Sequence, residues 1–272
     1  MAIVTISRGS ASGGLLLARG LAERLGYQFV SREEIIRDAA KFGIAEANLE
    51  KALFQPPVFS EDFKHVIKCY LTFFQEALCT RAEKDNIIYL GHAAHLLLRG
   101  IAHVFRIRLI APPEYRIRTL VERKGMTKEQ AATYIEQVDA QRRAWTLLLY
   151  GVDWLSPNLY DLTINLETMN IESAVEIAAA AVNCREFAAT IQSRKAVKDL
   201  LLESRVKAAL ASDAVAGSND IEVHADSASG MVFLKGEVQP ASVIDEMIRV
   251  AQGVAGATKI DGSQLHASEQ KD

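Results

Sequence analysis

The sequence predicts an α/β fold, with helices on both faces of a mostly parallel β-sheet, followed by a small α+β module. Over residues 2–183, short apolar or β-branched runs alternate with helical patterns, which is typical of parallel strands joined by crossover helices. A turn rich in Gly and Ser joins the first run to the first helical pattern. After about residue 195 the pattern changes to two period-2 runs between helices, which indicates a separate module.

Composition supports a folded protein. The chain has 272 residues, of which 49% are hydrophobic and 24% charged, with a net charge of −3. This length favours one large domain or two smaller ones, and the composition excludes disorder. No apolar run approaches the roughly 20 residues of a membrane-spanning helix, and the opening MAIVTISRG lacks the pattern of a signal peptide. Three cysteines lack metal-ligand spacing, so we expect reduced thiols, no metal site formed by the chain and a cytoplasmic location.

Charge is distributed unevenly along the chain. Residues 198–272 contain 7 basic and 12 acidic residues, whereas residues 1–197 contain 24 and 22. Neither balance is that of a nucleic-acid-binding protein. The acidic C-terminal part argues against docking on an anionic membrane.

The first elements follow from local patterns. Residues 2–6 (AIVTI) predict a buried strand, and leucines four residues apart form one stripe of a helix over 15–25. Ser31, with Glu34 at the capping-box position, predicts a helix over 31–42.

The later elements of the large domain follow in the same way. Prolines are tolerated in a first helical turn, and Thr127 with Gln130 forms a second capping box. The expected elements are a loop at 54–59, a helix at 61–84, strands at 86–90 and 104–110, helices from 113 and from 127 to 150, a strand at 161–166 and a helix at 171–182.

The C-terminal module has the order α-β-β-α-β. We expect a helix at 197–210, strands at 221–225 and 231–238, a helix at 241–252 and a short strand at 258–260. The predicted domains are therefore 1–195 and 198–262, with a polar tail at 263–272.

The loop between the first strand and the first helix is the most informative segment. Its sequence, SRGSASGG over residues 7–14, predicts backbone N–H groups and a helix N-terminus around one point, which favours phosphate binding. The strict pattern G-x-x-x-x-G-K-[ST] is not met, because Gly14 and Leu15 stand where lysine and Ser/Thr would be. Arg8 is the candidate replacement cation. An ordinary Gly/Ser turn is the alternative.

Five segments resemble the cytidylate kinase-like branch of the nucleoside monophosphate kinases. They are ITISRGSASGGLLLARGLAERLGY, IIYLGHAAHLLLRG, IRLIAPPEYRIRTLVERKGMTKEQA, VDAQRRAW and NLYDLTINLETMNIESAVEI. The resemblance covers roughly residues 2–183. It implies a three-layer P-loop kinase-like sheet and ATP- and Mg²⁺-dependent phosphorylation of CMP or a related acceptor.

The resemblance also implies roles for individual residues. The donor phosphates would be held by the loop residues Arg8, Gly9, Ser10, Ala11, Ser12, Gly13 and Gly14. A mobile lid would supply the catalytic residues Arg116, Arg123, Asp139, Arg142 and Arg143, together with Arg8. The acceptor would contact Ser31, Arg32, His92 and Arg99. The alternatives are a solvated charged face for the lid residues and a simple helix cap for Ser31.

Two departures from the family pattern bear on activity. His92 stands where the family has an arginine for the acceptor phosphate, and Ala11 stands where it has a glycine. Histidine is shorter and mostly neutral at pH 7, and alanine disfavours a positive φ. They motivate a second hypothesis, a catalytically impaired nucleotide sensor.

The C-terminal module resembles a BON domain. The resemblance rests on SRVKAALASD, IEVHADSASGMVFLKGEV and VAQGVAGATKI. That family is associated with phospholipid or other hydrophobic ligands, which leaves a lipid-associated assembly protein as a third reading. Because the module is acidic, we expect a regulatory or oligomerising role for it instead.

Overall fold

The computed structural model describes residues 2–43, 61–91, 93–219 and 221–267, without the side chains of 61–66 and 218. The chain forms two compact units. Within the described residues, the first unit contains 2–34 and 84–190, and the second contains 35–43, 61–83 and 191–267.

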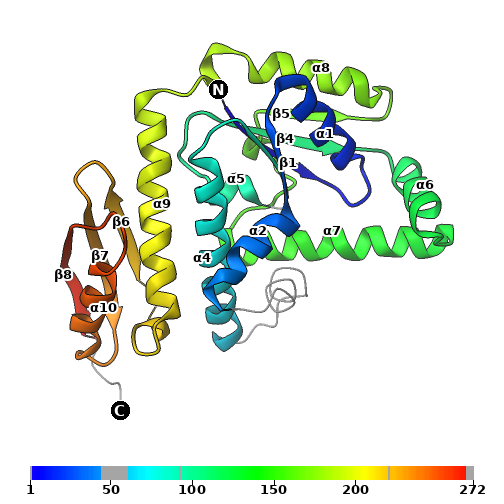
Figure 1. The fold of residues 1–272 in the computed structure, drawn as a ribbon. Coiled ribbons are helices and arrows are strands. Elements are labelled where there is room, and N and C mark those ends of the chain that lie inside the picture. The colour runs from blue at the N-terminus through cyan, green and yellow to red at the C-terminus, as the bar shows by residue number, and fades with distance from the viewer. Residues whose placement is uncertain (1, 44–60, 92, 220, 268–272) are drawn as a thin grey trace. The chain divides into compact units, whose positions relative to one another are not determined.

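The first unit is built on a five-stranded parallel sheet with the order β2-β3-β1-β4-β5 (Figure 1). The strands are β1 (Ile3–Arg8), β2 (Gln28–Ser31), β3 (Ile87–Leu90), β4 (Val104–Ile110) and β5 (Leu162–Asn165). The α/β fold class is therefore confirmed. The edge strand β2 was not expected, because its four residues contain only two apolar side chains and so form no extended apolar run. In the structure only Val30 of the four is buried.

Helices flank this sheet. Helices α1 (Gly14–Leu25) and α8 (Ile171–Val182) pack over one face, where Val4 and Ile6 of β1 join their buried core. The two helices lie side by side (Figure 1). Alternate residues of a strand point to opposite faces, and Ser7 contacts α5 (Ala94–Leu97), so α5 lies over the other face.

The remaining helices of the first unit follow the sequence pattern closely. Helix α6 spans Pro113–Lys124 and α7 spans Lys128–Tyr150, with the predicted capping box at Thr127 and Gln130 present. Short 3-10 turns lie at Pro157–Leu159 and Arg185–Phe187. Helix α2 (Arg32–Ala39) begins in the first unit, and its residues from Ile35, with the 3-10 turn at Ala40–Phe42, belong to the second.

The second unit contains a three-stranded sheet with the order β6-β7-β8. Its elements are α4 (Glu61–Ala82), α9 (Ile191–Ser212), a 3-10 turn (Ala216–Ser218), β6 (Glu222–Asp226), β7 (Met231–Val238), α10 (Val243–Gln252) and β8 (Lys259–Ala267). Strand β6 pairs antiparallel with β7, and β8 pairs parallel with it. Strand β8 extends into the segment expected to be a polar tail, because Leu265 is buried in the core of this sheet.

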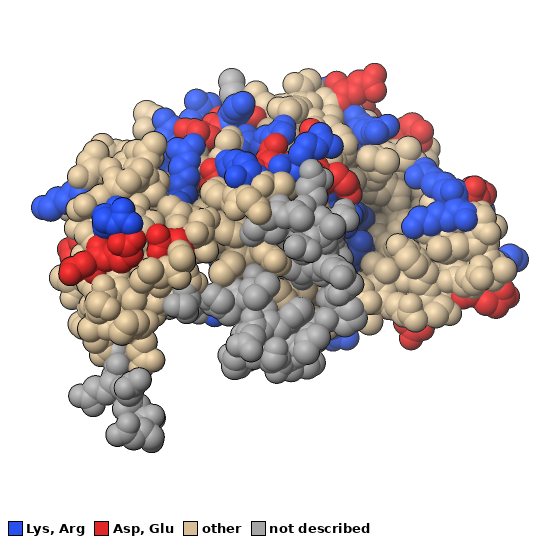
Figure 2. Space-filling view, turned by 60° about the horizontal axis from the view of Figure 1, so that its bottom comes forward, with Lys and Arg blue, Asp and Glu red and all other residues tan. Residues whose placement is uncertain are grey.

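The surface shows no extended region of one charge on the face in view. Figure 2 shows basic and acidic side chains interspersed there. Among the helices of the described residues, none is long and apolar enough to cross a membrane.

Candidate phosphate-binding site

The loop between β1 and α1 adopts a tight left-handed turn. Ala11 has φ 58° and Gly13 has φ 84°. The left-handed conformation costs alanine about 1 kcal/mol relative to glycine. Ala11 nevertheless adopts it, so the loop keeps the backbone course that the family's glycine would give. The Ser12 hydroxyl donates to the Gly9 carbonyl at 2.9 Å and so is used within the loop.

The start of α1 leaves backbone donors available. Gly13 is its N-cap and has no side-chain cap. Among the described residues, the N–H groups of Gly13, Gly14 and Leu15 have no hydrogen-bond acceptor. Unpaired N–H groups and the positive end of the helix dipole together attract anions. This geometry favours phosphate binding over an ordinary turn.

Arg8 brings a positive charge to this loop. A Cβ on Gly14 would lie 2.8 Å from Arg8 Cγ, so the side chain packs where the usual lysine would begin. Burial lowers the pKa of the Arg8 guanidinium from its ordinary value, but an arginine remains charged at neutral pH. No carboxylate among the described residues forms an ion pair with it.

Helices α6 and α7, which carry the predicted lid residues, contact the loop through Asp139. The Ser10 N–H donates to Asp139 Oδ1 at 3.0 Å, and Arg116 Nη2 donates to Asp139 Oδ2. Arg142 Nη1 lies 3.5 Å from Asp139 Oδ1. The same arginines donate to loop carbonyls, Arg116 Nε to Ser10 at 2.7 Å and Arg142 Nη1 to Arg8 at 3.0 Å. The structure thus brings together three of the predicted lid residues.

Cationic side chains line a cavity beside the loop. The cavity measures about 250 Å³ and includes Arg8, Ala11, Arg123 and Lys124 in its lining. Lys124 was not among the predicted residues, although its place next to Arg123 at the end of α6 could have indicated it. Tyr134 also lines the cavity, and the Lys124 ammonium lies 4.7 Å from the centre of its ring.

Three other predicted residues have partners within the chain. Arg143 forms an ion pair with Asp153 at 2.7 Å and is about half exposed. Ser31 caps the start of α2, since its hydroxyl accepts from the Glu34 N–H at 3.2 Å. The helix-cap alternative for Ser31 therefore accounts for its contacts. Arg32 forms an ion pair with Glu33 at 3.0 Å.

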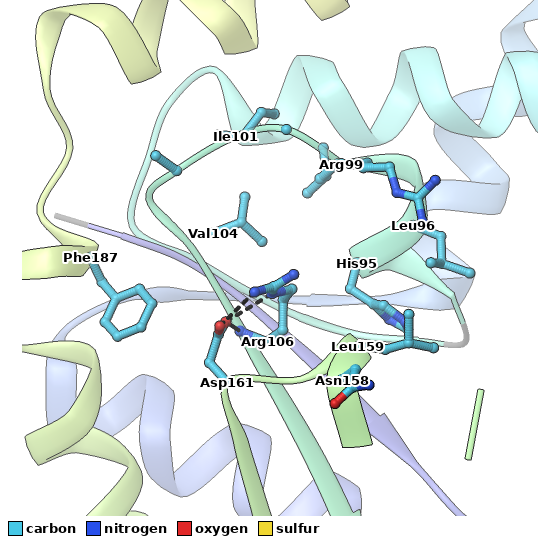
Figure 3. Close-up of a pocket in the computed structure, with 13 residues that line it drawn as sticks. His95, Leu96, Arg99, Ile101, Val104, Arg106, Asn158, Leu159, Asp161 and Phe187 are labelled. Atoms are coloured by element: carbon cyan, nitrogen blue, oxygen red, sulfur yellow. Dashed lines mark hydrogen bonds and ion pairs between the residues drawn. The ribbon is translucent and has the colours of Figure 1, made fainter. Parts of the chain in front are cut away.

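Arg99 lines a different cavity, of about 380 Å³, near the amino end of β4 (Figure 3). Arg106 lies within it and pairs with Asp161 at 2.6 Å. Arg8 pairs in register with Leu109, near the other end of β4, roughly 17 Å along the strand from Val104. Arg99 does not line the cavity beside the loop, and the predicted His92 lies outside the described residues.

A bound Mg²⁺ would find few ligands from the chain at this loop. Leu15 replaces the hydroxyl that usually binds the metal. Asp139 is already engaged by two guanidinium groups. These residues do not fit a site formed by the protein, so Mg²⁺ is expected to be held by the nucleotide phosphates and water.

The parallel sheet, its flanking helices and this loop define a P-loop kinase-like fold. Residues 3–168 match the cytidylate kinase-like family, and residues 198–266 match the BON domain. The first match covers more than half of the chain, which therefore belongs to the cytidylate kinase-like family.

Individual relatives agree with this assignment. A cytidylate kinase from Methanocorpusculum labreanum is 29% identical over 66% of this chain and 96% of its own length. One from Pyrobaculum arsenaticum is 28% identical over 65% of this chain and 91% of its own. A solved structure of an uncharacterized protein from Eubacterium ventriosum shares the fold with a TM-score of 0.52, at 18% identity, covering 68% of this chain and 99% of that one.

Proposed function

We propose that this protein is a nucleoside monophosphate kinase that transfers the γ-phosphoryl group of ATP to CMP or a closely related acceptor. The observation that carries the proposal is the loop itself. Among the described residues, three adjacent N–H groups without acceptors lie at the start of α1, and the aliphatic part of the Arg8 side chain packs against Gly14 there. Phosphoryl transfer requires mainly positioning and positive charge of this kind.

The proposed step is a direct displacement. An oxygen of the acceptor monophosphate forms a bond to the γ-phosphorus, and the bond between that phosphorus and the β–γ bridging oxygen breaks, which releases ADP. In this step the loop N–H groups and Arg8 hold the donor phosphates. Arg116, Arg123 and Arg142 of the lid would stabilise the charge on the transferred group. The BON-like module, for which no catalytic role is proposed, would regulate the kinase or join copies of the chain.

A coupled assay of ADP release tests the proposal, with ATP and Mg²⁺ and with CMP, dCMP, UMP and AMP as acceptors. We expect turnover that is highest with a cytidine nucleotide. Arg8→Ala should lower kcat/KM at least about 100-fold, because it removes a charge at the transferring phosphates. The matched control is Arg19→Ala, an exposed arginine on α1, which should leave the rate unchanged. Absence of turnover with every acceptor, despite measurable ATP binding, would contradict the kinase and leave the sensor hypothesis.

A further inference from the structure

The Asp139 carboxylate has the hydrogen-bond partners that a phosphoryl group would have. It accepts from a loop N–H, that of Ser10, and from the Arg116 guanidinium, and the Arg142 guanidinium forms an ion pair with it at 3.5 Å. An amide N–H and paired guanidiniums are also the donors with which proteins bind phosphate oxygens. Asp139 and both arginines are largely buried, with 24%, 15% and 15% of their side chains exposed.

The same arginines also use donor groups on carbonyls of the loop. Arg116 Nε donates to the Ser10 carbonyl, and Arg142 Nη1 donates to the Arg8 carbonyl. A Cβ on Gly9 would lie 3.1 Å from the Arg116 guanidinium, so this arginine lies directly against the loop. The two arginines thus neutralise an internal carboxylate.

We propose that Asp139 is an internal substitute for a phosphoryl group, which holds α6 and α7 against the loop until a nucleotide phosphate displaces it. The inference rests on the proposed function, because it requires that the loop bind phosphates. The carboxylate and the ligand compete for the same donors, so the apparent affinity for phosphates is reduced by the fraction of molecules in the Asp139-bound state.

Inorganic tripolyphosphate is a suitable probe, because it has the phosphates of the donor but no base and no acceptor. Its binding is measured by titration calorimetry to the wild-type chain and to Asp139→Asn. The matched control is Asp153→Asn, which removes the carboxylate that pairs with Arg143. Thermal unfolding followed by circular dichroism establishes that each variant is folded.

We expect Asp139→Asn to bind tripolyphosphate about fivefold or more tightly than the wild type, and Asp153→Asn to bind like the wild type. Hydrogen exchange at the Ser10 N–H should also become faster in Asp139→Asn without ligand, because its acceptor is weakened. If Asp139 instead only positions the arginines, the variant binds more weakly or equally, which overturns the inference while the phosphate site stands. If neither protein binds tripolyphosphate or ATP, the proposed function itself fails and the inference fails with it.

Discussion

Ala11 allows a sharp test of the loop conformation. With φ 58° it occupies a region where alanine is disfavoured by about 1 kcal/mol. Ala11→Gly removes that strain but gives the unfolded chain more freedom, which costs about 0.4–1 kcal/mol. The strain is the larger of the two effects. Because alanine at positive φ is destabilising overall, we expect the free energy of unfolding to rise by up to about 1 kcal/mol. The same change at an alanine in a regular helix should lower it by about 1 kcal/mol.

Two further substitutions complete this experiment, in which urea unfolding is followed by circular dichroism. Ala93→Gly starts from a similar φ of 61° outside the loop and should behave like Ala11→Gly in stability. Ala22→Gly lies within α1 and should lower the free energy of unfolding by about 1 kcal/mol. Only Ala11→Gly should also strengthen tripolyphosphate binding, since it removes a methyl group from the loop. A loss of 1 kcal/mol or more at Ala11 would show that this residue is right-handed and that the loop geometry described above is wrong.

Three other predictions concern groups outside the loop. Burial lowers the pKa of His95 to about 4, so the unfolded chain binds a proton at this residue more readily than the folded chain. The free energy of unfolding should therefore fall by about 2 kcal/mol between pH 7 and 5. Urea unfolding at both pH values should show this loss, and His95→Gln should reduce it. Burial raises the pKa of Cys79 to about 12. Iodoacetamide at pH 8 should therefore modify the exposed Cys184 first and Cys79 only after unfolding. Peptide mass mapping would show the order of modification. Thr127→Ala removes the hydroxyl that caps α7 and should lower the free energy of unfolding by about 1 kcal/mol; an unchanged urea midpoint would contradict this role.

Much of the fold was predictable because the local signals were strong. The β-branched run of β1, the capping box before α7 and the prolines at the start of α6 each specify an element within a few residues. The edge strand β2 was not predictable, since its strand conformation depends on pairing with β3 and its own composition carries no strand pattern. The length of β8 depends in the same way on its pairing with β7.

The site was only partly predictable. The sequence indicated the loop through its glycine, serine and arginine residues, and the resemblance to the family implied the lid arginines. The resemblance implied that Asp139 is a lid residue, but not that it accepts a hydrogen bond from the Ser10 N–H, 129 positions away. That contact depends on how the lid meets the loop. Likewise, nothing local in the sequence showed that Arg99 lies at another cavity or that Arg143 pairs with Asp153.

At Gly13, the uncapped start of α1, a change that stabilises the helix would weaken the proposed anion binding. An aspartate or serine at position 13 is the usual means of stabilising the first turn of a helix, yet its oxygen would take up the N–H groups that an anion needs. Gly13, at φ 84°, avoids that competition and leaves the helix incomplete. A search for more thermostable variants that favoured a side-chain cap here would therefore select against the site itself.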